Sequence, residues 1–226
     1  MKIHEKTLSC KPLNHSGICD LFLRIIKNLM ILTDHLSDVN FLLKKLEEIP
    51  SELINSGDKN VLNMIDKVKN LEDLETDLDK TKEIKQFLIL IGGTINNPKL
   101  GIILDASHLL DEDGCREFRQ NQEIKSILSQ FIFDENFLEL CDSSSTKPIH
   151  LIIRASKDSN FELCNPRPEF NIPKHCPIYA ICPSVFRDDT IDLNTFVKPK
   201  YNFSYLFEES LDDSDLIWFY FNKIIK

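Results

Sequence analysis

The sequence predicts an α+β fold in which an N-terminal helical segment precedes a mixed β-sheet flanked by helices. Apolar residues recur at spacings of three and four from residue 17 to residue 78, which is the period of amphipathic helices. After Lys85 the pattern changes to short apolar runs separated by glycine, asparagine and proline clusters, as in strands and turns. A hydrophobic content of 42% in 226 residues is enough for one sizeable core.

Residues 1–56 are predicted to form an N-terminal helical arm. Residues 1–16 are polar and mixed in charge, and we expect them to be irregular. Helical spacing runs from residue 17 to residue 49, with a break near residues 33–37. Such helices can pack on the sheet that follows or dock a partner chain, and the sequence leaves both interpretations open.

Residues 57–226 are predicted to form an α/β domain that begins and ends with a helix. Asp58 is a suitable N-cap for the first of these helices, whose apolar stripe extends to Leu78. Acidic residues up to Asp215 suit the N-terminus of a C-terminal helix, because of its macrodipole. The aromatic residues of this tail must be buried, in this core or against a partner, and the candidate partner-binding residues are Trp218, Phe219 and Phe221.

The middle of the domain is predicted to contain a β-hairpin. The apolar runs 87–91 and 100–104 flank a turn-forming Asn-Asn-Pro-Lys cluster. Gly92 and Gly93 lie between them. We interpret this pair as the corner at which a helix turns into a central strand, since glycine allows backbones to approach closely.

The remaining segments are assigned by period and length. Helical spacing predicts a helix over residues 124–133. Apolar runs predict strands over residues 148–154 and 178–182, and a strand is also expected at residues 137–141.

Charge and cysteine usage restrict the functional classes. The net charge is −9, and most of it lies after residue 86. Lysine and arginine supply most of the affinity for phosphates, so RNA binding would need a local basic patch or a basic partner chain. The seven cysteines are odd in number and irregularly spaced, and no apolar run approaches the roughly 20 residues of a membrane span. We therefore expect reduced thiols, no membrane span and a cytoplasmic or nuclear location.

The order of these segments resembles the Schlafen domain. In that family a helix leads into a stretch that ends in a glycine pair, followed by a β-hairpin, and the run from Gln86 to Asp105 is similar to this element. The segment Phe131–Glu139, followed by the run from His150 to Ser156, is similar to the family's aromatic-rich helix-to-strand segment and the strands that come after it. The run from Cys182 to Thr190 is similar to its Ser-x-x-aromatic-Arg-x-x-Thr pattern. The resemblance covers residues 60–200, about two-thirds of the chain.

The resemblance implies a role in RNA processing. Schlafen domains of this class are RNA endonucleases or their non-catalytic partners, and single-lobe members are expected to pair with another lobe. The family includes subunits of a multi-chain nuclease that trims piRNA precursors. We therefore expect a subunit of a metal-dependent RNA endonuclease complex, hetero-oligomeric with other Schlafen-like chains and acting on small-RNA precursors or tRNA-like RNA. The alternative is a non-enzymatic adaptor of a nuclear or cytoplasmic complex.

The catalytic lobe of that family holds Mg²⁺ or Mn²⁺ with carboxylates, which are the ligands that hard cations prefer. Asp105 stands where the family's aspartate would be, although a strand-end or turn role is the preferred interpretation. The family's Glu-x-x-x-x-Glu-aromatic-Lys pattern is not found here. Glu72, Glu75 and Glu83 are interpreted as a solvated helix face. The chain is therefore not expected to be catalytic alone.

Two further sets of residues are candidate ligand contacts. Arginine fits phosphate bidentately, so the candidate RNA contacts are Arg154, Lys157 and Arg187, with Arg167 and Lys174 as further cations. Arg187 can instead pair with the aspartates that follow it. A His/Cys zinc site would use Cys164, His175, Cys176 and Cys182, but their spacing is not that of a CxxC pair and ordinary buried cysteines are preferred.

Overall fold

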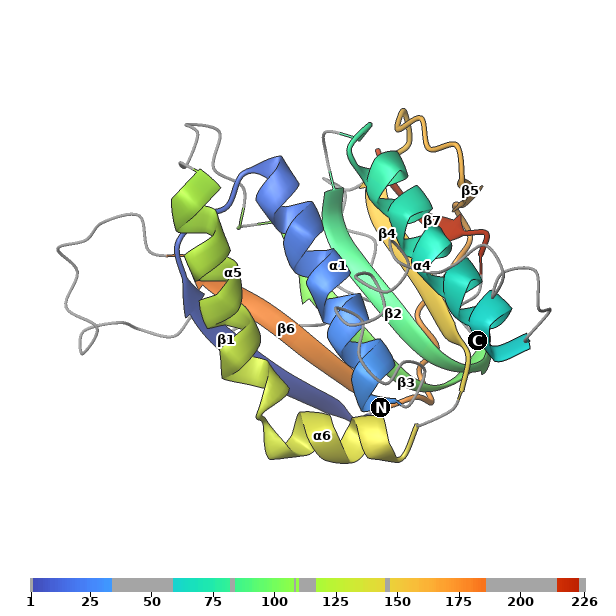
Figure 1. Cartoon of the computed structure of the whole chain (residues 1–226), viewed down its shortest axis with the longest axis horizontal. Coiled ribbons are helices and arrows are strands. Elements are labelled where there is room, and N and C mark those ends of the chain that lie inside the picture. Colours follow the sequence, from blue (N-terminus) through green and yellow to red (C-terminus); the bar gives the residue numbers. More distant parts are fainter. Residues whose placement is uncertain are drawn as a thin grey trace, which may run out of the picture.

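The computed structural model describes residues 2–33, 59–81, 84–107, 109, 117–144, 147–185 and 215–223. These residues form a seven-stranded mixed sheet with the strand order β1-β6-β3-β2-β4-β7-β5. Figure 1 shows the helices α1 (His15–Leu32), α4 (Lys59–Leu78) and α5 (Glu117–Ile132) gathered in front of the sheet. The α+β class predicted from the sequence is confirmed.

The chain begins with a strand, which corrects the expected irregular arm. β1 (Ile3–Cys10) forms one edge of the sheet and pairs in parallel with β6 (Ile178–Val185). Leu8 and Cys10 are buried while Ser9 between them is exposed, the alternation of a half-buried strand. The partner strand comes from the other end of the chain, so the local sequence did not reveal the pairing.

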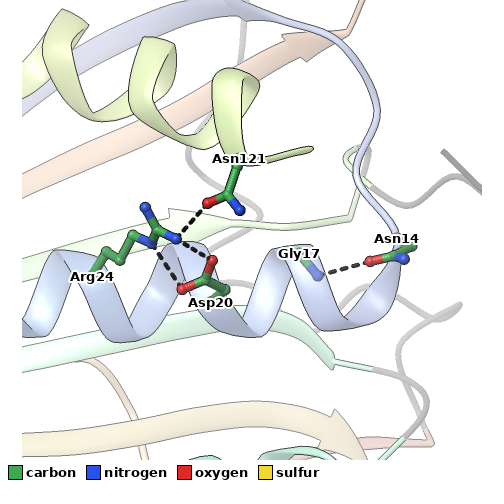
Figure 2. Close-up of polar contacts among 5 residues, drawn as sticks. All are labelled: Asn14, Gly17, Asp20, Arg24 and Asn121. Atoms are coloured by element: carbon green, nitrogen blue, oxygen red, sulfur yellow. Dashed lines mark hydrogen bonds and ion pairs between the residues drawn. The ribbon is translucent and has the colours of Figure 1, made fainter. Parts of the chain in front are cut away.

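The predicted N-terminal helix is confirmed as α1 (His15–Leu32). Asn14 is its N-cap and accepts a hydrogen bond from the Gly17 N–H at 2.8 Å (Figure 2). Arg24 binds Asp20 through two bonds of 2.8 Å and Asn121 of α5 through a bond of 2.6 Å, which ties two helices together (Figure 2). The predicted second helix and the break at residues 33–37 lie almost wholly outside the described residues.

The next predicted helix is confirmed as α4 (Lys59–Leu78), and its proposed cap, Asp58, lies outside the described residues. Val68, Leu71, Leu74 and Leu78 form its buried stripe. Glu72 and Glu75 are exposed, as expected of a solvated helix face, and Glu83 lies outside the described residues.

The predicted hairpin is confirmed and lies at the centre of the sheet. It consists of β2 (Ile84–Thr94) and β3 (Asn97–Asp105), paired antiparallel. The interpretation of the glycine pair is wrong. Gly92 and Gly93 lie at the far end of β2, next to the hairpin turn, because the strand has already begun at Ile84. A close approach does exist at Gly92, but it joins the two strands of the hairpin: a Cβ there would lie 2.7 Å from Pro98 Cα.

The described part of the segment between the hairpin and the next strand contains two helices and no strand. α5 (Glu117–Ile132) confirms the predicted helix, and α6 (Glu135–Asp142) replaces the strand expected at residues 137–141. Asp134 caps α6 by accepting the Phe137 N–H at 3.3 Å. Buried Phe137 and Cys141 are four residues apart, which is helical spacing that a five-residue window concealed.

The predicted strands near residues 148–154 and 178–182 are confirmed as β4 (Ile149–Ser156) and β6. The predicted C-terminal helix is wrong: Leu216–Phe221 is strand β7, which lies between β4 and β5 (Cys164–Arg167). Aromatic and β-branched residues favour a half-buried strand, and here they fill a gap between two strands.

The core has two parts, one on each side of the sheet. The larger lies under the helices and includes Phe22 of α1, whose ring stacks on Phe87 of β2 with centroids 4.0 Å apart. The smaller lies on the opposite side, where Phe170, Ile172 and Cys176 pack on the strands. β1 and α1 thus share one sheet and one core with the elements after residue 57. No helix in the described part of the chain is both long and apolar enough to cross a membrane.

Candidate nucleic-acid interface

A group of arginine and aromatic side chains lies near the β5 end of the sheet, on the side opposite the helices. Alternation along β7 places Trp218 and Tyr220 on this side, whereas Phe219 and Phe221 belong to the core under the helices. Trp218 is the register partner of an arginine on each neighbouring strand. The basic–aromatic cluster consists of Arg154, Arg167, Phe170, Trp218 and Tyr220.

Arg154 is the buried cation of the cluster. Its guanidinium carbon lies 5.7 Å from the centre of the Trp218 ring, and Nη1 donates a hydrogen bond to Gln86 Oε1 at 3.3 Å. Only 8% of Arg154 is exposed. The ring face and the amide oxygen partly replace water around the charge, and this arrangement stabilises a guanidinium in a largely apolar setting.

Arg167 is the exposed cation of the cluster. Its guanidinium carbon lies 6.0 Å from the centre of the Tyr220 ring. Phe170 meets Trp218 edge-on, with centroids 5.9 Å apart. An exposed guanidinium can bind a phosphate bidentately. The rings of Phe170 and Tyr220 are partly exposed, and aromatic rings can stack with bases, so the arrangement is chemically suited to single-stranded or looped RNA.

His150 fixes the orientation of Tyr220. The Tyr220 hydroxyl donates to Nδ1 at 3.1 Å, and Nε2–H donates to the Gly92 carbonyl at 3.2 Å, which selects the neutral Nε2–H tautomer. Burial lowers the pKa of His150, and the bond to Gly92 opposes this only in part. Burial raises the pKa of Tyr220, and Arg167 opposes this, so the phenol stays protonated at neutral pH.

Asp105, the candidate catalytic residue, lies on the same side of the sheet as Arg154. It is the register partner of Gln86, which is in turn the partner of Arg154. Two strand spacings separate Asp105 from Arg154, roughly 10 Å. Asp105 is only 5% exposed, and its Oδ1 accepts the Ser107 N–H at 3.0 Å. An aspartate at the end of a strand commonly accepts such a bond from the backbone two residues further on.

The other predicted RNA contacts are placed differently. Lys157 directly follows β4 and forms an ion pair with Asp215, which raises the pKa of the lysine. Lys174 is exposed, and Arg187 lies outside the described residues. The structure therefore brings together Arg154, Arg167 and Trp218 but not all the predicted cations.

The predicted partner-binding residues do not form one surface. Phe219 and Phe221 are buried in the chain's own core, at 3% and 0% exposure. Trp218 is covered by Arg154 and Phe170. Phe219 and Phe221 are thus buried in the chain's own core rather than against a partner.

The candidate zinc ligands do not converge. Cys164 lies in the core under the helices, whereas Cys176 and Cys182 lie on the opposite side of the sheet, and His175 is exposed. The six cysteines of the described residues are all free and buried. Across the described ranges, no three His, Cys, Asp or Glu side chains are grouped as metal ligands. Asp105 by itself does not fit a Mg²⁺ or Mn²⁺ site, because one carboxylate supplies too few of the oxygen ligands that these ions need.

Comparison of the chain with protein-family models and with curated proteins found no match.

Sequence reasoning missed three contributors to this interface: His150, Phe170 and Tyr220. The residues 216–221 themselves carried a signal for Tyr220. If they are assigned as a strand, its period of two places Trp218 and Tyr220 on one side of the sheet and Phe219 and Phe221 on the other. No local signal pointed to His150, because its two hydrogen-bond partners lie 58 and 70 residues away.

Proposed function

We propose that the chain is an RNA-contacting subunit of a Schlafen-type RNA endonuclease complex and is not catalytic alone. The observation that carries the RNA contact is the exposed guanidinium of Arg167 over the Tyr220 ring, beside the buried pair of Arg154 and Trp218. A net charge of −9 gives no general attraction for nucleic acid, so a compact contact of this kind suits the chain better than a broad basic surface.

The nuclease part of the proposal rests on the resemblance of the hairpin and of the strand that carries Arg154. Asp105 supports it by lying on the same side of the sheet as the basic–aromatic cluster. In this proposal a second Schlafen-like chain supplies the carboxylates that hold Mg²⁺ or Mn²⁺. The substrate class is a small-RNA precursor or a tRNA-like RNA.

The test uses the complex that co-purifies with the full chain and a fluorescently labelled RNA stem-loop. Removal of one exposed phosphate contact in Arg167→Ala should weaken RNA binding about fivefold. The dependence of log affinity on log salt should become shallower by about 1. Fluorescence anisotropy over a salt series measures both. Cleavage of the RNA is followed in Mg²⁺ or Mn²⁺ and after chelation.

Lys69→Ala is the matched control, because Lys69 is an exposed cation on α4, on the other side of the sheet. It should leave the RNA affinity unchanged. Equal effects of the two variants would refute the RNA contact. A complex that cleaves no RNA with either metal would refute the nuclease assignment.

A non-enzymatic adaptor is the second candidate, and the bond from Ser107 N–H to Asp105 favours it. That bond gives the carboxylate a structural role at the strand end. For an adaptor, Asp105→Asn should leave assembly of the complex unchanged, and the complex should bind no RNA. Loss of cleavage in this variant, with the fold and the RNA affinity intact, would exclude the adaptor.

A further inference from the structure

We propose that the outer edge of β1 binds an extended segment of another protein in which basic and apolar residues alternate. The binding edge consists of the backbone of Ile3, Glu5 and Thr7 together with the side chains of Phe133 and Leu138. It lies at the opposite end of the strand order from β5 and the basic–aromatic cluster. The inference therefore goes beyond the proposed RNA contact and does not depend on it.

The backbone of β1 has one side bonded and one side directed outward. The Ile178 N–H donates to the Lys2 carbonyl at 3.0 Å, which fixes the phase of the parallel pairing with β6. Residues of a paired strand direct their N–H and C=O groups to alternate sides. Even-numbered residues of β1 therefore face β6, and Ile3, Glu5 and Thr7 point away from it. Among the described residues, none bonds these outward backbone groups.

The second half of the same edge is already closed by side chains of α5. The Ser9 N–H donates to Gln130 Oε1 at 3.2 Å, and Gln130 Nε2 donates to the Ser9 carbonyl at 3.1 Å. The amide of Gln130 thus takes the place of a neighbouring strand. Glu123 accepts the Lys11 N–H at 2.7 Å. The open part is therefore short, and it suits a segment of about five residues.

An exposed apolar pair flanks Asp134, whose carboxylate binds Lys6 of β1. Phe133 is 78% exposed and Leu138 is 37% exposed, and they occupy the two positions of a hydrophobic staple around the N-cap Asp134. The ion pair of 2.7 Å between Lys6 Nζ and Asp134 holds this corner against β1. Figure 1 shows α6 turning beneath the start of β1. We infer that the helix-side residues of an added strand would contact Phe133.

The charges around the edge indicate a basic partner. Glu5 projects to the side opposite the helices, and Glu135, Glu139 and Asp142 are exposed on α6, which contains no basic residue. Of the nearby lysines, Lys6 is paired with Asp134, and Lys2 and Lys11 lie just beyond the two ends of β1. Pairing with a second copy of the chain is disfavoured. If two copies paired antiparallel through Ile3, Glu5 and Thr7, twofold symmetry would place Glu5 directly opposite Glu5 of the other copy, and the two like charges would repel each other.

The test uses the full chain and three synthetic peptides. The first alternates valine and lysine, the second alternates valine and glutamate, and the third is the first with alternate backbone nitrogens methylated. The lysine peptide should bind most tightly and should slow amide hydrogen exchange at Ile3, Glu5 and Thr7. Glu5→Lys should weaken its binding up to about fivefold and should favour the glutamate peptide instead. Phe133→Ser should weaken it about tenfold.

Glu72→Lys is the matched control, since it makes the same charge change on the exposed face of α4 and should alter nothing. The proposal is overturned if no peptide binds at millimolar concentration or if the methylated peptide binds as well as its parent. Protection of the outward amides in the free monomer would mean that the chain covers its own edge. A dimer in sedimentation that Glu5→Lys abolishes would mean that a second copy covers it.

Discussion

Asp77 is a single residue whose side chain joins two distant segments. It is 1% exposed, and its carboxylate accepts the Glu162 N–H at 2.7 Å and the Leu163 N–H at 2.9 Å. It thereby fastens the end of α4 to the chain that enters β5. We expect Asp77→Ala to lower the free energy of unfolding by about 2–4 kcal/mol, because two backbone donors lose a charged acceptor. Urea denaturation measures the change.

Asp79→Ala is the control for this prediction. Asp79 is exposed two residues further along the same chain segment, so its loss should change the free energy of unfolding by less than about 0.5 kcal/mol. Similar values for the two variants would show that the carboxylate of Asp77 does not hold the 162–163 backbone.

His150 should make stability depend on pH. Its folded pKa is lowered by burial, so below the ordinary pKa of histidine the unfolded chain binds more protons than the folded chain. The contribution of His150 to stability is thus complete above that ordinary pKa, and it decreases as the pH falls towards the folded pKa. Denaturation at pH 7.5 and at pH 5.5 should show less stability at the lower pH.

His150→Gln should reduce this difference between the two pH values, because glutamine does not titrate. Carboxylates contribute equally to the pH dependence of the variant and of the parent, so the difference between the two proteins reports on His150. If the variant keeps the full pH dependence of the parent, that dependence comes from groups other than His150.

The hairpin offers a prediction at the scale of one element. A Cβ at Gly92 would lie 2.7 Å from Pro98 Cα and 2.9 Å from the Lys99 nitrogen, both backbone atoms, whereas a Cβ at Gly93 meets nothing within 4 Å. Gly92→Ala should therefore cost about 1–3 kcal/mol of stability, since the backbone must shift. Gly93→Ala should be within about 0.5 kcal/mol of the parent. Thermal denaturation distinguishes the two, and equal shifts would contradict the close approach.

The start of α1 offers a second prediction at this scale. Asn14→Ala removes the side chain that accepts the Gly17 N–H and should lower the free energy of unfolding by about 1 kcal/mol. Asn14→Ser keeps an acceptor and should restore most of the loss. If serine is no better than alanine in chemical denaturation, the cap does not stabilise the helix.

Elements with long, regular patterns could be predicted, and so could the short strands β4 and β6, but two other short elements could not. α1, α4, α5 and the central hairpin followed from period and turn chemistry. The segments 137–141 and 216–221 were assigned to the wrong class. Both are short apolar runs, in which helix and strand periods are hard to separate. The N-cap Asp134 favours the helix at residues 137–141, and the gap between β4 and β5 favours the strand at residues 216–221.

The whole molecule should unfold as one unit. The parallel pairing of β1 with β6 and the stacking of Phe22 on Phe87 connect the first residues to the rest of the sheet. Trp218 is the only tryptophan and reports on β7, whereas far-ultraviolet circular dichroism reports on the helices. The two signals should give the same midpoint in urea. Separate transitions would instead support a division near residue 56.

The sequence by itself determined the α+β class, the central hairpin, the main helices and the chemistry of the candidate cations. These features depend on neighbouring residues, whose spacing and turn propensities are local properties. Only the tertiary structure decided that the first and last described segments are strands and that Arg154 and Arg167 flank Trp218. Strand pairing and cross-strand contacts join residues far apart in the chain, so they are set by the shared burial of a sheet rather than by any local pattern.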